Sequence, residues 1–175
     1  MTTSGGAPAV RQPAWSPPLT WLPRALLAPS SPARSVAVGW LLSFPLSILL
    51  AFMVQSLAPD AAGPEFPMRG PVAILMLVAF APIVETMLMG GGLLVLLRFV
   101  HPSTAVIVSA VAWGAFHSLL VPIWGLTIWW PFLVFSTLFV AWHSRSLAMA
   151  FAVPAATHAL HNLPPALLVA AGYTG

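Results

Sequence analysis

The sequence predicts an all-α protein, a polytopic bundle of about five transmembrane helices, from three observations. The 175-residue chain is 59% hydrophobic and only 5% charged, whereas soluble domains carry about 25% charged residues. Apolar segments of roughly 20 residues recur along it, which is the length that an α-helix needs to cross a bilayer. Short connections such as "RFVHPS" and "HSRS" separate these segments, so consecutive helices are expected to run antiparallel.

We expect the five helices at about 35–57, 71–98, 103–121, 124–142 and 146–172. Prolines within the last segment are expected to kink or break it; they are Pro154, Pro164 and Pro165. Residues 1–34 are rich in Pro, Ser, Ala and Gly and predict a flexible N-terminal tail. Residues 35–175 form the predicted membrane domain.

The few charged residues predict the orientation in the membrane. The chain has six Arg and no Lys, and a cytoplasmic N-terminus puts five of the six on the cytoplasmic side, leaving Arg69 outside. The positive-inside rule favours this arrangement, and we expect it in the plasma membrane of a prokaryote. Because basic patches interleaved with aromatic residues are absent, nucleic acid is not an expected partner. Without Cys, a thiolate nucleophile and a Cys-based metal site are excluded.

Glu85 is one of only three acidic residues, and it lies in the apolar stretch "FAPIVETMLMGGG". A carboxylate there opposes membrane insertion by about 2.5–3.5 kcal/mol, which indicates a functional role. At about 1.5 Å per residue, Glu85, His117 and His158 lie roughly 20, 21 and 18 Å from the cytoplasmic ends of their helices. Three helices therefore bring titratable groups to about the same depth. Asn162 follows His158 by four residues and shares its helix face.

These four residues suit hydrolysis by water. Glu85 and His117 together can act as a general base, while His158 and Asn162 can donate hydrogen bonds to an oxyanion. Trp113, four residues before His117, is expected to pack beneath it. A divalent metal such as zinc, bound by Glu85, His117 and His158, stays open as an alternative, although no HExxH motif occurs. No cofactor is certain from the sequence.

The stretches "APIVETMLMGG", "WGAFH" and "HALHN" resemble the three motifs of the CPBP intramembrane proteases, the family of CAAX prenyl endopeptidases and bacterial Abi-type proteins. The family motifs are EExxxR, FxxxH and HxxxN, and together they cover about residues 71–165. The resemblance implies a four-helix catalytic core. It also implies that Glu85 and His117 activate water and that His158 and Asn162 form the oxyanion hole.

The chain departs from the first motif at two positions, with Thr86 for the second Glu and Gly90 for the Arg. Because both charges are lost together, neither is left unpaired in the membrane. The triplet Gly90–Gly92 is expected to mediate close helix packing, or to leave room for a substrate backbone beside Glu85. Gly91 and Trp113 are thus candidate substrate contacts.

We therefore expect an intramembrane endopeptidase that acts on a membrane protein or peptide in the lipid bilayer. Two alternatives remain. One is a non-catalytic scaffold or immunity-type protein of the same fold, which the changes at Thr86 and Gly90 favour. The other is a proton or ion pathway, since Glu and His residues inside membranes often relay protons.

Overall fold

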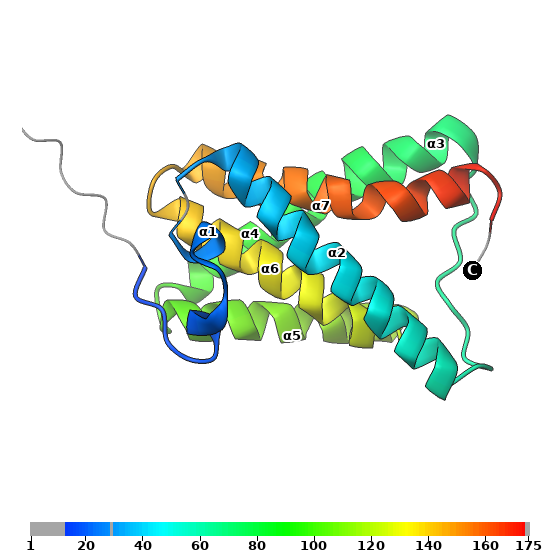
Figure 1. Ribbon diagram of the computed structural model, residues 1–175, viewed down its shortest axis with the longest axis horizontal. Helices are drawn as coiled ribbons and strands as arrows, with labels where there is room; N and C mark the ends of the chain where they lie inside the picture. The colour runs from blue at the N-terminus through cyan, green and yellow to red at the C-terminus, as the bar shows by residue number, and fades with distance from the viewer. Residues whose placement is uncertain (1–12, 29, 174–175) are drawn as a thin grey trace, which may run out of the picture.

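The computed structural model describes residues 13–28 and 30–173, and this part of the chain is a bundle of helices joined by loops (Figure 1). The predicted all-α fold is confirmed. The five long helical segments are α2 (Pro32–Leu57), the continuous run of α3 (Gly70–Ile74), η2 (Leu75–Phe80) and α4 (Ala81–Leu96), α5 (Pro102–Leu120), α6 (Gly125–His143) and α7 (Leu147–Ala170).

Four of these segments are long and apolar enough to cross a membrane: α2, the α3–α4 run, α5 and α6. The sequence predicts about five such helices, and the predicted helical membrane bundle agrees with the structure. The segment that differs is α7, because two histidines and an asparagine lie at its centre (His158, His161 and Asn162) and lower its hydropathy. Its three prolines do not break it. Each proline removes only one N–H donor, and neighbouring helices can compensate for that loss inside a membrane protein.

Local sequence signals set where the helices begin. Proline occupies the first position of α2 and of α5, where its missing N–H would have no partner within the helix in any case. The Ser31 side chain accepts a hydrogen bond from the backbone N–H of Arg34 at the start of α2. Ser146 caps α7 in the same way through Met149 N–H. These caps explain why the predicted boundaries lie within a few residues of the observed ones.

The N-terminal segment is not a free tail over its described part, which corrects the prediction for residues 1–34. It forms a short 3₁₀ turn (Leu19–Trp21) and α1 (Arg24–Leu27). Three leucines anchor it in the core (Leu19, Leu26 and Leu27). The Trp15 indole donates to the Leu27 carbonyl, and Ser16 N–H donates to Ser103 Oγ on α5. Residues 1–12, which include Arg11, and residue 29 lie outside the described residues.

Helix α6 is the central element, in contact with α1, α2, α4, α5 and α7. Its residues 131–142 are all buried. The approach of α5 to α6 is especially close, because a methyl group at Gly125 would overlap the carbonyl of Gly114. Small residues at such crossings are typical of membrane helices. This crossing fixes the end of α5 that carries His117 against the start of α6.

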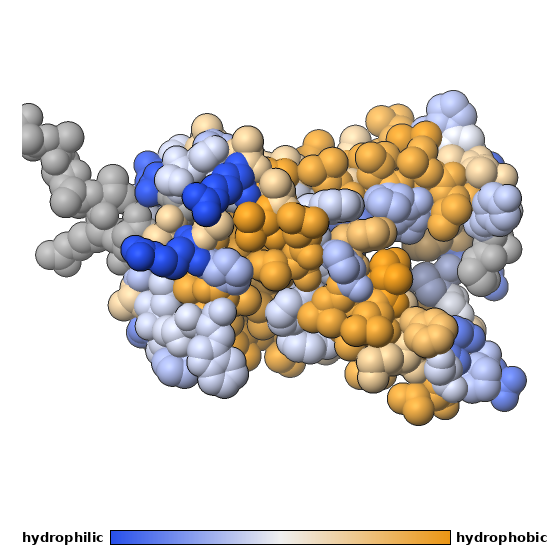
Figure 2. Space-filling model, viewed as in Figure 1, coloured by the Kyte–Doolittle hydropathy of each residue, from blue (hydrophilic) through white to orange (hydrophobic). Residues whose placement is uncertain are grey.

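The surface of the bundle is apolar where a membrane would surround it. Hydrophobic residues cover the middle of the visible face, and the strongly hydrophilic ones gather toward its ends (Figure 2). More than half of the side chain area is exposed at Leu41, Phe52, Val95 and Val111. Lipid accommodates such a belt, whereas soluble monomers rarely expose apolar patches of this extent.

The described arginines are separated by the antiparallel course of the helices. Arg24, Arg34, Arg98 and Arg145 belong to α1, the start of α2, and the α4–α5 and α6–α7 connections, which lie at one end of the bundle (Figure 1). Arg69 lies in the α2–α3 loop at the other end, together with Asp60 and Glu65. The fold thus keeps the segregation of positive charge that the sequence predicts.

Candidate functional site

A cavity of about 550 Å³ lies inside the bundle, and all four predicted catalytic residues line it. Glu85 comes from α4, His117 from α5, and His158 and Asn162 from α7. Most of the other lining side chains are apolar. The remaining polar ones come from α2, α6 and α7: Ser47, Thr127 and His161.

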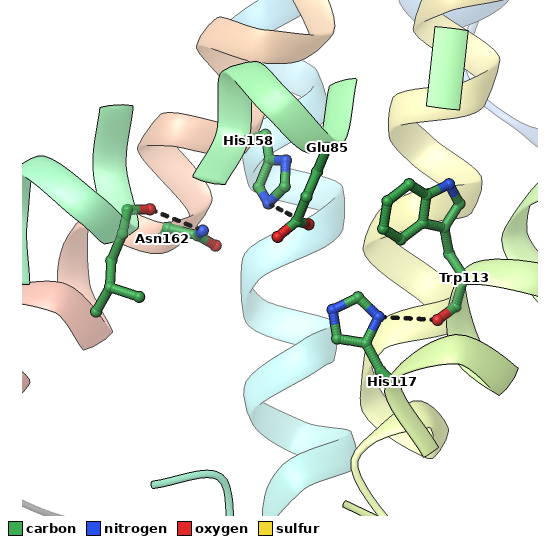
Figure 3. A network of polar contacts seen from close by, with 6 residues as sticks. Glu85, Trp113, His117, His158 and Asn162 are labelled. Carbon is green, nitrogen blue, oxygen red and sulfur yellow. Dashed lines mark hydrogen bonds and ion pairs between the residues drawn. The ribbon is translucent and has the colours of Figure 1, made fainter. Parts of the chain in front are cut away.

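Glu85 and His158 face each other within this cavity (Figure 3). Glu85 Oε2 lies 3.9 Å from His158 Nε2, which is an ion-pair distance if the imidazole is protonated and is longer than a hydrogen bond. The Glu85 side chain is 26% exposed, against 5% for His158. The carboxylate is therefore the more accessible group of the pair, and His117 makes no contact of this kind with it.

His117 is held by a hydrogen bond of 2.8 Å between its Nδ1 and the carbonyl of Trp113. A carbonyl can only accept, so Nδ1 carries a proton and Nε2 is left as the acceptor of the neutral ring. Figure 3 shows this second nitrogen turned toward the space below Glu85. The ring packs edge-on against Trp124, with the centroids 4.9 Å apart. The end of α5 thus presents an oriented imidazole to the cavity.

His158 is positioned by aromatic packing on α6. Its ring stacks on Phe135 at 4.7 Å between centroids and packs edge-on against Phe132. Its Nδ1 is buried and has no hydrogen-bond partner among the described residues. Of the two ring nitrogens, Nε2 therefore faces Glu85.

Asn162 spans the cavity wall by donating its side-chain N–H to the carbonyl of Leu77, at 3.0 Å. Leu77 lies in η2, a π-helical turn in which Ala81 N–H bonds to Met76 O, five residues earlier. In this register the Leu77 carbonyl would bond to residue 82, which is Pro82 and has no N–H. Asn162 therefore satisfies a carbonyl that Pro82 leaves without a partner. In the sequence, Pro82 was the one sign that a carbonyl one turn earlier would need a donor from elsewhere.

His161 and α2 contribute to the site in a way that the sequence analysis did not anticipate. His161 Nδ1 lies 3.1 Å from Ser43 Oγ on α2, 118 positions away in the chain. The ring packs edge-on against Phe44 and Phe135. The pair ties α7 to α2 at the cavity wall, and no periodicity in either segment signals a contact of this range.

The two candidate substrate contacts, Trp113 and Gly91, are not among the residues that line the cavity. Trp113 packs under His117, as expected, and stacks on Phe132 with centroids 4.4 Å apart. Gly91 is exposed on the outer side of α4, and a methyl group there would meet no atom within 4 Å. It lies six residues after Glu85, so it projects from a different face of the helix.

The two departures from the family motif fit tightly into this packing. A side chain at Gly90 would overlap the rings of Phe139 and Phe151, so an arginine has no space there. Thr86 is 2% exposed, and its hydroxyl has no hydrogen-bond partner within the described chain. Aromatic side chains thus occupy the volume that a charged pair would need.

The metal alternative is not supported by the arrangement of side chains. Within residues 13–28 and 30–173, no group of three or more His, Asp or Glu side chains is placed to hold a metal ion. Glu85 and His158 approach each other, but His117 does not complete a three-ligand set.

No protein-family profile, curated protein or solved structure matches this chain. The resemblance to the CPBP proteases accordingly rests on the three short motifs.

Proposed function

We propose that the protein is an intramembrane endopeptidase that hydrolyses a peptide bond of a membrane-associated substrate. The observation that carries this proposal is the convergence of Glu85, His117, His158 and Asn162 from three helices on one apolar cavity. Ionisable residues inside membrane helices are costly, and they commonly mark functional sites.

In the proposed reaction, a water molecule is the nucleophile. Glu85 takes a proton from the water while the water oxygen attacks the carbonyl carbon of the scissile bond. His117 Nε2 accepts a hydrogen bond from the same water and so helps to orient it. The resulting tetrahedral oxyanion then collapses. The C–N bond breaks, and the proton held by Glu85 passes to the departing amine, which leaves a carboxylic acid and an amine and restores the Glu85 carboxylate; the acid then loses its proton to the medium.

The oxyanion is assigned to the α7 side of the cavity. An asparagine amide has two N–H donors, so the one that is not bonded to Leu77 remains available. His158 supplies the second donor through the one ring N–H that a neutral imidazole carries. Fixed donors of this kind typically contribute about 2.7–4 kcal/mol each to transition-state stabilisation.

The charge distribution supports a cytoplasmic N-terminus in a prokaryotic plasma membrane. In this orientation the α2–α3 loop and the α5–α6 turn face outward. Because His117 lies only three residues before the end of α5, the site would be nearer the outer surface than the cytoplasmic one.

The test compares the amino termini of membrane proteins in cells that express the wild type, Glu85→Gln or Asp60→Asn. Glu85→Gln keeps the size of the side chain and removes the base, whereas Asp60→Asn makes the same chemical change in an exposed loop. We expect new termini with the wild type and with Asp60→Asn that are absent with Glu85→Gln. Identical profiles from three folded proteins would contradict the proposal and leave the non-catalytic scaffold, which Thr86 and Gly90 favour.

A further inference from the structure

The loop between α2 and α3, residues 58–69, runs along one end of the bundle (Figure 1) and contributes to the wall of the cavity. We call this loop the strap. From residue 64 onward its side chains alternate: Pro64, Phe66 and Met68 line the cavity, while Glu65 and Pro67 are exposed. A period of two is the geometry of an extended chain. The strap therefore lies over the cavity as an extended peptide with every second side chain turned inward.

Side chains, rather than backbone pairing, hold the strap in place. No backbone–backbone hydrogen bond joins residues 62–68 to a helix in the described chain. The contact across the cavity is an edge-on packing of Phe66 against Trp124, with centroids 6.1 Å apart. The Arg69 guanidinium donates to the Phe66 and Met68 carbonyls within the strap itself. Such a segment can be displaced without breaking a helix or a backbone ladder.

The strap is also connected to the proposed catalytic machinery through Trp124. This side chain packs edge-on against both Phe66 and His117. Displacing Phe66 would uncover Trp124 and open the cavity beside His117 and Glu85. The position of the strap is thus coupled to access to the site.

From these contacts we propose that the strap occupies the binding site for the substrate and must be displaced for substrate to bind. This inference rests on the proposed endopeptidase function and names the substrate class. The substrate is an extended polypeptide segment with apolar side chains at alternate positions. It approaches from the end of the bundle opposite the one that carries Arg24, Arg34, Arg98 and Arg145. A peptide bond must be extended and accessible to be hydrolysed, and the strap already presents a backbone in that form.

The first test measures access to the cavity and does not depend on activity. The chain has no Cys, so Thr127→Cys, in the cavity wall on α6, gives a single reporter for a water-soluble maleimide. Adding Phe66→Ala removes the contact with Trp124, and adding Glu65→Ala, which faces outward, is the matched control. An aromatic pair changes an equilibrium constant, here that between the covered and the open cavity, by about two- to tenfold. We therefore expect Phe66→Ala to speed the labelling of Thr127→Cys by about this factor, and Glu65→Ala to leave the labelling rate unchanged. A second reporter, Ser47→Cys on α2, repeats the test if Thr127→Cys does not fold.

The second test joins the strap to the bundle in membrane vesicles. In Glu65→Cys/Pro122→Cys, two exposed positions beside Phe66 and Trp124 in the chain, a bifunctional maleimide should abolish the formation of the new termini, while the unjoined double variant and each treated single variant still form them. Equal labelling rates for the Phe66→Ala and Glu65→Ala proteins, or undiminished cleavage after joining, would overturn the inference while Glu85-dependent cleavage stands. Faster labelling without any Glu85-dependent termini would instead retain the movable strap and reject the proposed function.

Discussion

Gly90 and Gly91 are neighbours on α4 in opposite environments, and replacing each by alanine gives opposite expected effects on stability. A methyl group at Gly90 would lie 2.5 Å from a ring carbon of Phe139 and would also overlap Phe151. Phe139 is fully buried and cannot move aside without disturbing α6. Overpacking of this kind typically destabilises a protein by about 1–3 kcal/mol.

At Gly91 the same methyl group meets nothing within 4 Å. Alanine is favoured over glycine in a helix interior by about 0.8–1.0 kcal/mol, and this gain applies equally to both positions. The difference between the two variants therefore isolates the packing term, and Gly90→Ala should be less stable than Gly91→Ala by about 1–3 kcal/mol.

The measurement is equilibrium unfolding of the two purified variants in the same detergent, with the wild type alongside. Gly91→Ala should match or exceed the wild type, and Gly90→Ala should fall below it. If both variants unfold at the same point, the aromatic rings do not close over Gly90. In that case Gly90 would have space for a larger side chain.

Two further predictions concern the cavity wall and the orientation. Asn162→Ala leaves the Leu77 carbonyl without its donor and should lower the free energy of unfolding in detergent by about 1–3 kcal/mol. The control, Gln55→Ala, removes an exposed bond of the same kind at 3.0 Å and should change the free energy of unfolding by less than about 0.5 kcal/mol. Equal losses in the two variants would contradict the role given to the π-helical turn. In intact cells, an impermeant maleimide should label Ala62→Cys in the strap but label Ser144→Cys in the α6–α7 turn only after permeabilisation, and the reverse pattern would overturn the assigned orientation.

The positions of the helices were predictable from the sequence because local features mark their ends. The expected segment 103–121 corresponds to α5 at Pro102–Leu120, and 124–142 to α6 at Gly125–His143. The cavity-lining positions of Glu85, His117, His158 and Asn162 also agree with the equal depths calculated from helix rise. Depth along a helix follows from counting residues, and this calculation needs no knowledge of how the helices pack.

Features that depend on packing between distant segments were not predictable. The bond between His161 and Ser43 joins residues 118 positions apart, and neither segment carries a pattern that selects the other. The composition of the strap does not reveal that its alternate side chains turn inward. The different environments of Gly90 and Gly91 were not predictable either, since three consecutive glycines give no signal of which one faces the core.

The central claim is that Glu85 acts as the base for peptide-bond hydrolysis, and purified protein in lipid vesicles tests it most directly. The substrate is a membrane protein whose cleavage depends on Glu85 in cells, and the rate is compared for the wild type and Glu85→Gln at equal unfolding stability. Removing a general base typically lowers a rate by about 10²–10⁴-fold, and we expect a loss in this range. A Glu85→Gln protein that cleaves the substrate as fast as the wild type would contradict the account.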